Sequence, residues 1–293
     1  MKSEVTIVSC YYPLGCSKHS IEEYTVWVAN FLKYIDTPIV MFSEGKTYDW
    51  LCKLREEAGL LDRFFPIQKA FDELEFSSPE WVDIWDRQNS LGYWKDQRFQ
   101  EVYRIWANKS YFVTEAIQKN PFESNYFVWC DAGCWRNVDT AKIFGHNWPS
   151  PKALQPNKIF LVNIESMEPY IEKLKDPAIQ TLDDVVTKIP TYLRMTVGGT
   201  ILGGDKQAWA IWTPLFRQVL ECFVRHNVFA GDDQSVITST ILWIMKILPA
   251  FSPTIINDPV GRGFFCFRDG KRLDDRWYVL QIILSQEFSH YFG

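Results

Sequence analysis

The sequence lacks the short motifs that identify the commonest nucleotide-binding proteins and hydrolases. No G-x-G-x-x-G follows its first apolar run, and no G-x4-G-K-S/T loop is present. It also contains no G-x-S-x-G, so it offers no nucleophile elbow of the kind found in serine hydrolases. These absences argue against a dinucleotide site of the Rossmann type, a P-loop and a serine-hydrolase triad.

Histidine is scarce, and the cysteines follow no metal-binding pattern. The four histidines form no pair at ligand spacing, although His290, close to the C-terminus, is an additional candidate metal ligand. The seven cysteines are odd in number, and Cys130 and Cys134 form a C-x3-C pair that no second pair completes. A structural zinc site is therefore not expected, and reduced thiols in a cytosolic protein fit the pattern better.

Long hydrophobic runs and a large excess of one charge are also missing. The first apolar run is too short for a secretory signal and contains Glu4, and the most apolar stretch, Val236–Phe251, is interrupted by a lysine and a proline. That stretch is shorter than the ~20 residues that span a bilayer. The net charge of −5 predicts no duplex-binding surface. We expect a cytoplasmic protein with no transmembrane segment and no nucleic-acid partner, whose membrane contact, if any, is peripheral.

Aromatic residues, by contrast, are abundant, and they make up 16% of the chain, including 13 tryptophans. Tryptophan and tyrosine rings pack in cores, and their flat faces also stack on sugars and bases. Trp81, Trp85 and Trp94 lie in a polar segment, residues 77–100, that breaks the alternation of apolar runs. Two interpretations stay open: the segment covers part of a functional site, or it is a surface helix pair whose tryptophans dock on the core.

Apolar runs of strand length alternate with amphipathic runs of helix length in the N-terminal part of the chain. Strands are predicted in EVTIVSCYY, TPIVMFSE and DRFFPIQKAF, and helices in SIEEYTVWVANFLKYI, with Ser20 as the expected cap, and in TYDWLCKLREEAGL. This alternation predicts an α/β protein with a parallel sheet and helices on its faces, and Pro66 places the third strand at an edge. Ligands of such sheets bind beyond the carboxyl ends of the strands.

The rest of the chain continues the pattern without repeats or clear linkers. A long amphipathic helix is predicted before Pro121, followed by strands in NYFVWC and NKIFLVNIE. TVGGTILGG predicts a short strand between two glycine pairs, with a helix from about Asp205, and AGDDQSVITSTILWIMKIL predicts a turn with acids at the start of a buried helix. We therefore expect one compact domain.

The segment NYFVWCDAGCWRN holds the first candidate site. Its apolar run ends in Asp131, followed by Ala132 and Gly133. A carboxylate at a strand end can face a cleft, and a glycine lets the backbone come close to a ligand. Mg²⁺ and Mn²⁺ are typically held by one or two carboxylates together with substrate phosphates. The segment is therefore a candidate site for a metal and a diphosphate, and the alternative is an aspartate that accepts hydrogen bonds in an ordinary turn.

A second acidic cluster, GDDQS, lies just before an apolar helix. Asp232 or Asp233 could cap that helix, because helix starts favour carboxylates. Two adjacent acids with Gln234 exceed what capping needs, so one of them could act as a general base on an acceptor hydroxyl. The glycine pairs of GGTILGG, residues 198–204, either let a ligand approach the backbone amides or form two tight turns around one edge strand.

Two basic residues, Arg104 and Lys109, lie on the helix that precedes Asp131. They are five residues apart in the sequence, so they do not share a helix face closely. Either side chain could reach a diphosphate, but charges on a solvated helix surface are the commoner explanation.

Three segments taken together resemble the HtrL/YibB-like proteins: YRIWANKSYFVTEAIQKNPFESNYFVWCDAGCWR, GGTILGGDKQAW and AGDDQSVI. FLKYIDTPIVMFSE fits the N-terminal half of that family. Those proteins are grouped with nucleotide-sugar glycosyltransferases of the GT-A fold. The resemblance implies a GT-A-like αβα sandwich with a mostly parallel central sheet, in a single domain, residues 1–293. Its nucleotide-binding half would span about 1–135 and its acceptor-binding half about 136–293.

The resemblance also implies roles for residues near the donor. Asp131 stands at the position of the metal-binding DxD motif, although the pattern here is Asp-Ala-Gly with a single acid. Ala132 and Gly133 complete that motif and would lie against the nucleotide sugar. Lys109 matches a lysine in the family's preceding helix and would contact the nucleotide or its phosphates.

Further residues of the chain match other parts of the expected site. Tyr11 and Tyr12 follow the first strand, where GT-A enzymes hold the base. Gly198, Gly199 and Gln234 fall where the sugar and the acceptor meet. These positions are implied by the resemblance and by the order of the motifs.

For Asp232 and Asp233 the resemblance implies two possible roles. Inverting GT-A enzymes have a catalytic base at this position, and some retaining ones carry an Asp-Gln motif that handles donor or acceptor hydroxyls. The leading hypothesis is a glycosyltransferase that moves a sugar from a UDP- or GDP-linked donor to the hydroxyl of a glycan or glycoconjugate acceptor, with Mn²⁺ or Mg²⁺ held by Asp131. One alternative is a non-catalytic nucleotide- or carbohydrate-binding protein on the same fold, which the single acid favours. Another is a nucleotidyltransferase or metal-dependent hydrolase, which usually needs a second clustered carboxylate.

Overall fold

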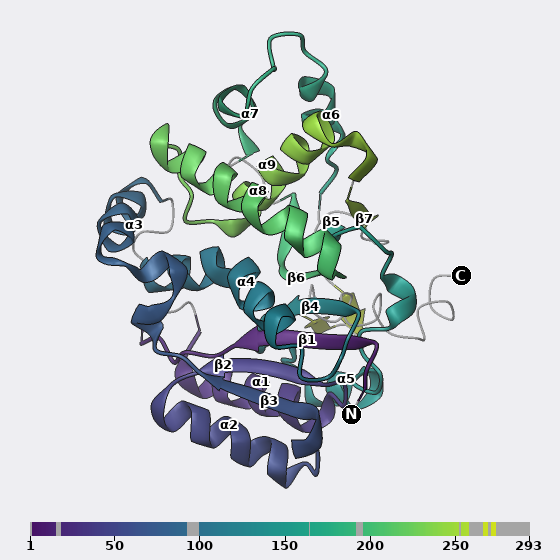
Figure 1. Ribbon diagram of the computed structural model, residues 1–293. Coiled ribbons are helices and arrows are strands. Elements are labelled where there is room, and N and C mark those ends of the chain that lie inside the picture. Colours follow the sequence, from purple (N-terminus) through teal and green to yellow (C-terminus); the bar gives the residue numbers. More distant parts are fainter. Residues whose placement is uncertain are drawn as a thin grey trace.

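One seven-stranded sheet organises the chain, with strands in the order β3-β2-β1-β4-β6-β5-β7 (Figure 1). The computed structural model describes residues 2–15, 19–92, 100–163, 165–191, 196–251, 253–257, 266–268 and 271–273. The strands of this sheet are β1 (Val5–Cys10), β2 (Ile39–Ser43), β3 (Phe64–Gln68), β4 (Tyr126–Cys130), β5 (Phe160–Asn163), β6 (Val197–Asp205) and β7 (Thr254–Asn257). A separate two-stranded ladder joins β8 (Cys266–Arg268) to β9 (Lys271–Leu273).

The sheet is mostly parallel. β1 runs parallel to β2 and β4, β2 runs parallel to β3, and β5 runs parallel to β7. Only β6 runs against its neighbours β4 and β5 in this sheet. The predicted α/β class with a mostly parallel central sheet is therefore confirmed, and so is the edge position of β3, which contains Pro66.

Helices cover both faces of the sheet, and each face has its own hydrophobic cluster. Alternate residues of β4 divide between them: Phe127 and Trp129 pack on one side, and Val128 and Cys130 on the other. The first side is covered by α3 (Pro79–Leu91), α4 (Gln100–Lys119), α6 (Glu168–Leu174), α7 (Leu182–Lys188), α8 (Lys206–Arg225) and α9 (Asp233–Ile247). The second is covered by α1 (Ile21–Tyr34), α2 (Gly45–Glu57) and α5 (Val138–Phe144).

The helix starts follow the capping signals of the sequence. The Ser20 side chain accepts from the Glu23 backbone amide at the start of α1, and the Glu23 side chain accepts from the Ser20 amide in return. Asp205 and Asp232 cap α8 and α9 through their side-chain oxygens. α4 ends at Lys119, two residues before Pro121, as expected.

Two tryptophans of the polar segment, Trp81 and Trp85, dock on the core. The Trp85 ring is fully buried and its Nε1 donates to the Phe76 carbonyl at 2.9 Å, while the Trp81 ring packs edge-on against the Phe76 ring. For these two residues the core-packing interpretation is therefore the one observed. Trp94 and His290 lie outside the described residues.

The glycines of GGTILGG do not form the two tight turns around an edge strand that were one interpretation of the sequence. They lie inside the nine-residue strand β6, which is hydrogen-bonded on both sides, so they form neither turns nor an edge. A Cβ atom on Gly203 would lie 2.7 Å from the Phe160 ring, and one on Gly204 would lie 2.8 Å from the Ile159 side chain. These two glycines therefore admit neighbouring side chains of the protein itself.

β4 belongs to the first expected half of the chain and β6 to the second, and the two strands pair along their length. The two halves therefore share one sheet, and the boundary near residue 135 stays a prediction. Cys10, Cys52, Cys130, Cys134 and Cys222 form no disulfides, as expected. No helix in the described part of the chain combines the length and the apolar character that crossing a membrane requires.

Candidate functional site

A buried lysine joins three parts of the chain that lie far apart in the sequence. Lys109 projects from α4, and its ammonium nitrogen lies 2.6 Å from Asp233 Oδ2, 2.7 Å from the Gly199 carbonyl oxygen and 3.1 Å from Asp131 Oδ1. An ammonium group has three protons to donate, so these acceptors account for all of them. The Lys109 side chain is 6% exposed, which makes this an internal ion cluster.

The topology of the sheet explains why these residues meet. Asp131 follows the last residue of β4, and its backbone amide donates to the Thr200 carbonyl at 3.0 Å. Because β6 runs antiparallel to β4, it begins at the edge where β4 ends, and this brings Gly199 beside Asp131. Asp233 is the first residue of α9, which packs on β6. The cluster therefore lies at the carboxyl edge of the parallel strands, where α/β sheets bind ligands.

The charges of the cluster act on one another. Burial alone would lower the pKa of Lys109, but the carboxylates of Asp131 and Asp233 outweigh it and raise that pKa. Burial raises the pKa of Asp131, the Asp233 carboxylate adds to the effect, and the Lys109 ammonium opposes both. The cluster therefore places one basic side chain between two acidic ones.

Asp131 is the member of the cluster that faces outward. Its side chain is 29% exposed, whereas that of Asp233 is 7% exposed. Its Oδ1 accepts from Trp129 Nε1 at 2.7 Å and lies 3.1 Å from the Lys109 nitrogen, while Oδ2 accepts a long hydrogen bond from Lys109 at 3.5 Å. Because the side chain is partly exposed, the carboxylate can take a further partner. This fits a Mg²⁺ or Mn²⁺ ion that takes one ligand from the protein and others from phosphate and water.

Asp232 and Asp233 differ in their surroundings although they are adjacent. Asp232 is half-buried and its side chain accepts from the Gln234 amide, so it caps α9. Asp233 is buried against the start of β6, where a Cβ atom on Gly199 would lie 2.4 Å from Asp233 Oδ2. Gly199 is therefore needed for the carboxylate to reach Lys109, and the space beside it holds a side chain of the protein.

The other glycines and Gln234 have local roles in the packing. A Cβ atom on Gly133 would lie 2.8 Å from the Tyr24 ring, so the side of Gly133 where a Cβ would lie is occupied by α1. Ala132 is buried in the same turn. Gly198 lies in β6 opposite Val162, and Gln234 Nε2 donates to a β6 carbonyl at 2.8 Å.

Tyr11 and Tyr12 follow β1 as expected, but both rings are buried, at 7% and 4% exposure. The Tyr12 hydroxyl donates to the Lys69 carbonyl at 3.1 Å, and its ring stacks on Phe112. The Tyr11 ring packs near Trp50. Both rings are thus part of the packing around β1, and their role in holding a base stays a prediction.

Two features of this site were not predicted from the sequence. Arg104 and Lys109 are buried, although charges on a solvated helix surface were the commoner explanation. Trp129, which hydrogen-bonds Asp131, was not singled out. The signal was present, because residues two apart on a strand point to the same face.

A sequence model whose description reads "Bacterial protein of unknown function (HtrL_YibB)" matches residues 94–250, which is more than half of the 293 residues. The chain belongs to the HtrL_YibB family. Lys109, Asp131, Gly199 and Asp233 all lie within the part that this family describes.

No curated protein matches this HtrL_YibB chain. Among solved structures, it is similar to the crystal structure of core-mannan synthase A (CmsA/Ktr4) from Aspergillus fumigatus in its Mn/GDP form. The two sequences are 12% identical and the TM-score is 0.43. The similarity covers 82% of this chain and 70% of the synthase chain.

Proposed function

We propose that this protein is a nucleotide-sugar-dependent glycosyltransferase that uses a divalent cation. It would move a sugar from a UDP- or GDP-linked donor to the hydroxyl of a glycan or glycoconjugate acceptor. The observation that carries the proposal is the cluster of Lys109, Asp131 and Asp233 at the carboxyl edge of the parallel strands. The resemblance of these segments to a family grouped with glycosyltransferases supports the same reaction.

Asp131 has the most direct role in this proposal. Its partly exposed carboxylate would hold Mn²⁺ or Mg²⁺, and the ion would offset the negative charge on the departing diphosphate. Trp129 and Lys109 both donate hydrogen bonds to this carboxylate and hold it in place, while the side chain stays 29% exposed. A carboxylate held in this way does not have to reorganise when the donor binds.

Lys109 is a positioning residue in this proposal. Its three donor positions are occupied by Asp131, Asp233 and the Gly199 carbonyl, so direct contact with a phosphate would require one of them to be released. The lysine instead locks the end of β4 to the start of α9. That link sets the distance between the donor side of the site and the acids of α9.

Asp232 is the better placed of the two adjacent acids to accept a proton from the acceptor hydroxyl. It is half-buried, whereas Asp233 is buried and paired with Lys109. A general base must reach the hydroxyl that it deprotonates, and a carboxylate held inside an ion cluster cannot do so without breaking that cluster. We therefore assign the base role to Asp232 and a structural role to Asp233.

The test is a turnover assay on the full chain with UDP- and GDP-sugars and a panel of glycan acceptors. Released nucleotide and glycosylated product are both measured, with EDTA and then with Mn²⁺ or Mg²⁺ restored. We expect acceptor-dependent product that EDTA abolishes and added metal restores. Asp131→Asn should lower kcat/KM by about 10²-fold or more, as removal of one electrostatic group in an active site commonly does.

Glu172→Gln is the matched control, because it also removes one carboxylate charge, from a side chain that is 69% exposed and paired with Lys175. It should retain full activity. Turnover that is unchanged by EDTA would remove the metal from the proposal, and full activity in Asp131→Asn would remove the role of that residue. Binding of UDP or GDP with neither transfer nor hydrolysis across the panel would favour a non-catalytic binding protein.

A further inference from the structure

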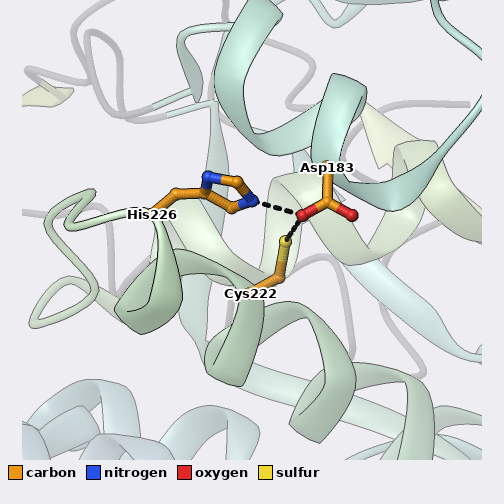
Figure 2. A group of neighbouring side chains, drawn as sticks. All are labelled: Asp183, Cys222 and His226. Carbon is orange, nitrogen blue, oxygen red and sulfur yellow. Dashed lines mark hydrogen bonds and ion pairs between the residues drawn. The ribbon is translucent and has the colours of Figure 1, made fainter.

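A second group of side chains with ligand chemistry lies at the end of α8. Asp183 is in the first turn of α7, Cys222 is in the last turns of α8, and His226 caps that helix. Their ligand atoms all lie within 4.8 Å of one another. Figure 2 shows the imidazole of His226 and the thiol of Cys222 directed at the same oxygen of Asp183. None of the three belongs to the Lys109 cluster.

The spacing of Cys222 and His226 in the sequence allows both side chains to bind one metal ion. Cys222 and His226 are four residues apart, so they lie on one face of the helix and their side chains can converge. Asp183 reaches the same point from a different helix, and its Oδ1 is 3.7 Å from Cys222 Sγ. In a tetrahedral zinc site with Zn–S of about 2.3 Å and Zn–O of about 2.0 Å, the sulfur and oxygen would be about 3.5 Å apart. The two ligand atoms are therefore already close to the separation that zinc requires.

The structure points to a zinc site: we propose that Asp183, Cys222 and His226 bind Zn²⁺ through one oxygen, one sulfur and one nitrogen, with water as fourth ligand. Sulfur and imidazole ligands select zinc over Mg²⁺ or Ca²⁺, which prefer oxygen. On binding, the Cys222 thiol releases its proton to solvent and the thiolate coordinates the ion. The thiolate and the carboxylate together then balance the charge of Zn²⁺.

Arg225 competes with the ion for the same ligands. Its Nη2 donates to Asp183 Oδ1 at 2.6 Å and lies 3.4 Å from Cys222 Sγ. The Arg225 side chain is 60% exposed, so its guanidinium can turn into solvent when the ion enters. Arg225 thus holds the ligands together in the metal-free protein, and zinc would replace it as the link between α7 and the end of α8.

The test uses the full chain without an affinity tag, stripped of metal by EDTA that is then dialysed away. Co²⁺ is titrated first, because a cobalt–thiolate bond gives a charge-transfer absorption band, and Zn²⁺ is then added to displace it. We expect one equivalent of Co²⁺ to produce the band and one equivalent of Zn²⁺ to abolish it. We also expect Zn²⁺ to raise the midpoint temperature of unfolding.

Two variants test the ligands, and a third tests the competing cation. Cys222→Ser should lose the band, and His226→Gln should weaken Co²⁺ binding about tenfold or more. Arg225→Met should bind more tightly than the wild type, because it removes the competing cation. Cys52→Ser, which alters a half-buried cysteine on α2, is the matched control and should keep the band.

The absence of a cobalt–thiolate band in the wild type would overturn the proposal, and so would a band that survives in Cys222→Ser. Equal affinity in His226→Gln and the wild type would remove the histidine and with it the three-ligand site. The His226 side chain is about one-third exposed, so its variant should fold, and circular dichroism checks this for each protein. Because no glycosyl transfer is measured, the result is independent of the function proposed above.

Discussion

Replacement of Lys109 by methionine tests whether the ion cluster is as buried as its geometry indicates. The change keeps most of the side-chain volume but removes the charge and all three donated hydrogen bonds. It leaves Asp233, which is 7% exposed, without its cationic partner. Removal of one partner of a buried ion pair costs about 3–5 kcal/mol, because the remaining charge stays buried without compensation. We expect a loss of that size in the free energy of unfolding.

The measurement is urea unfolding followed by tryptophan fluorescence, for which the 13 tryptophans provide ample signal. With a slope of about 3 kcal/mol per molar urea, the expected loss shifts the midpoint by about 1–1.7 M. Lys119→Met is the matched control on the same helix, because that side chain is 43% exposed and lies 3.8 Å from Glu115. It should cost about 0.5 kcal/mol or less.

A double variant separates the charge effect from the loss of packing. Lys109→Met combined with Asp233→Asn removes both buried charges, so it should be less destabilised than the sum of the two single variants by about 0.5–3 kcal/mol. A cost below about 1 kcal/mol for Lys109→Met, or strictly additive effects in the double variant, would refute the view that the cluster is a buried, coupled unit.

Two further changes test the packing around the site and around α2. Gly199→Ala should cost about 1–3 kcal/mol in the free energy of unfolding, because the new methyl group would lie 2.4 Å from Asp233 Oδ2. Gly15→Ala, where no heavy atom lies within 4 Å of the added carbon, should stay within about 0.5 kcal/mol in the same urea assay, and equal costs for the two would contradict the close approach. Arg55→Met should cost about 1–3 kcal/mol by thermal unfolding, because the buried guanidinium donates to two carbonyls at the end of α1, and a midpoint like that of the wild type would contradict this.

Local patterns were sufficient to predict most of the sheet. The apolar run from Glu4 to Tyr12 contains β1, and the capping signal at Ser20 marks the start of α1. Asp131 was placed correctly at the end of a central strand, because the apolar run stops there. These features depend on residues that lie close together in the sequence, and this is the range over which hydrophobic periodicity carries information.

The environment of Lys109 could not be predicted in the same way. α4 buries residues on more than one of its faces, since the sheet covers one side and α3 and α8 pack on others. A single-face interpretation of the helix therefore favoured a solvent-exposed Lys109. The prediction of two tight turns at the glycines of β6 was wrong for a related reason. Gly199 and Gly203 admit the side chains of Asp233 and Phe160, which are distant from them in the sequence.

Lys109, Asp131 and Asp233 meet in one cluster, and the side chains of Lys109 and Asp233 are buried in it. Well-packed apolar residues of similar volume often stabilise a protein as much as a buried ion pair does, or more. Stability alone therefore does not account for a lysine enclosed by two aspartates. The arrangement instead holds the Asp131 carboxylate by hydrogen bonds from Trp129 and Lys109 while its side chain stays 29% exposed. A carboxylate held in this way at the end of a central strand is a suitable ligand for a cation that arrives with a phosphate, which is the reason we propose that the donor binds there.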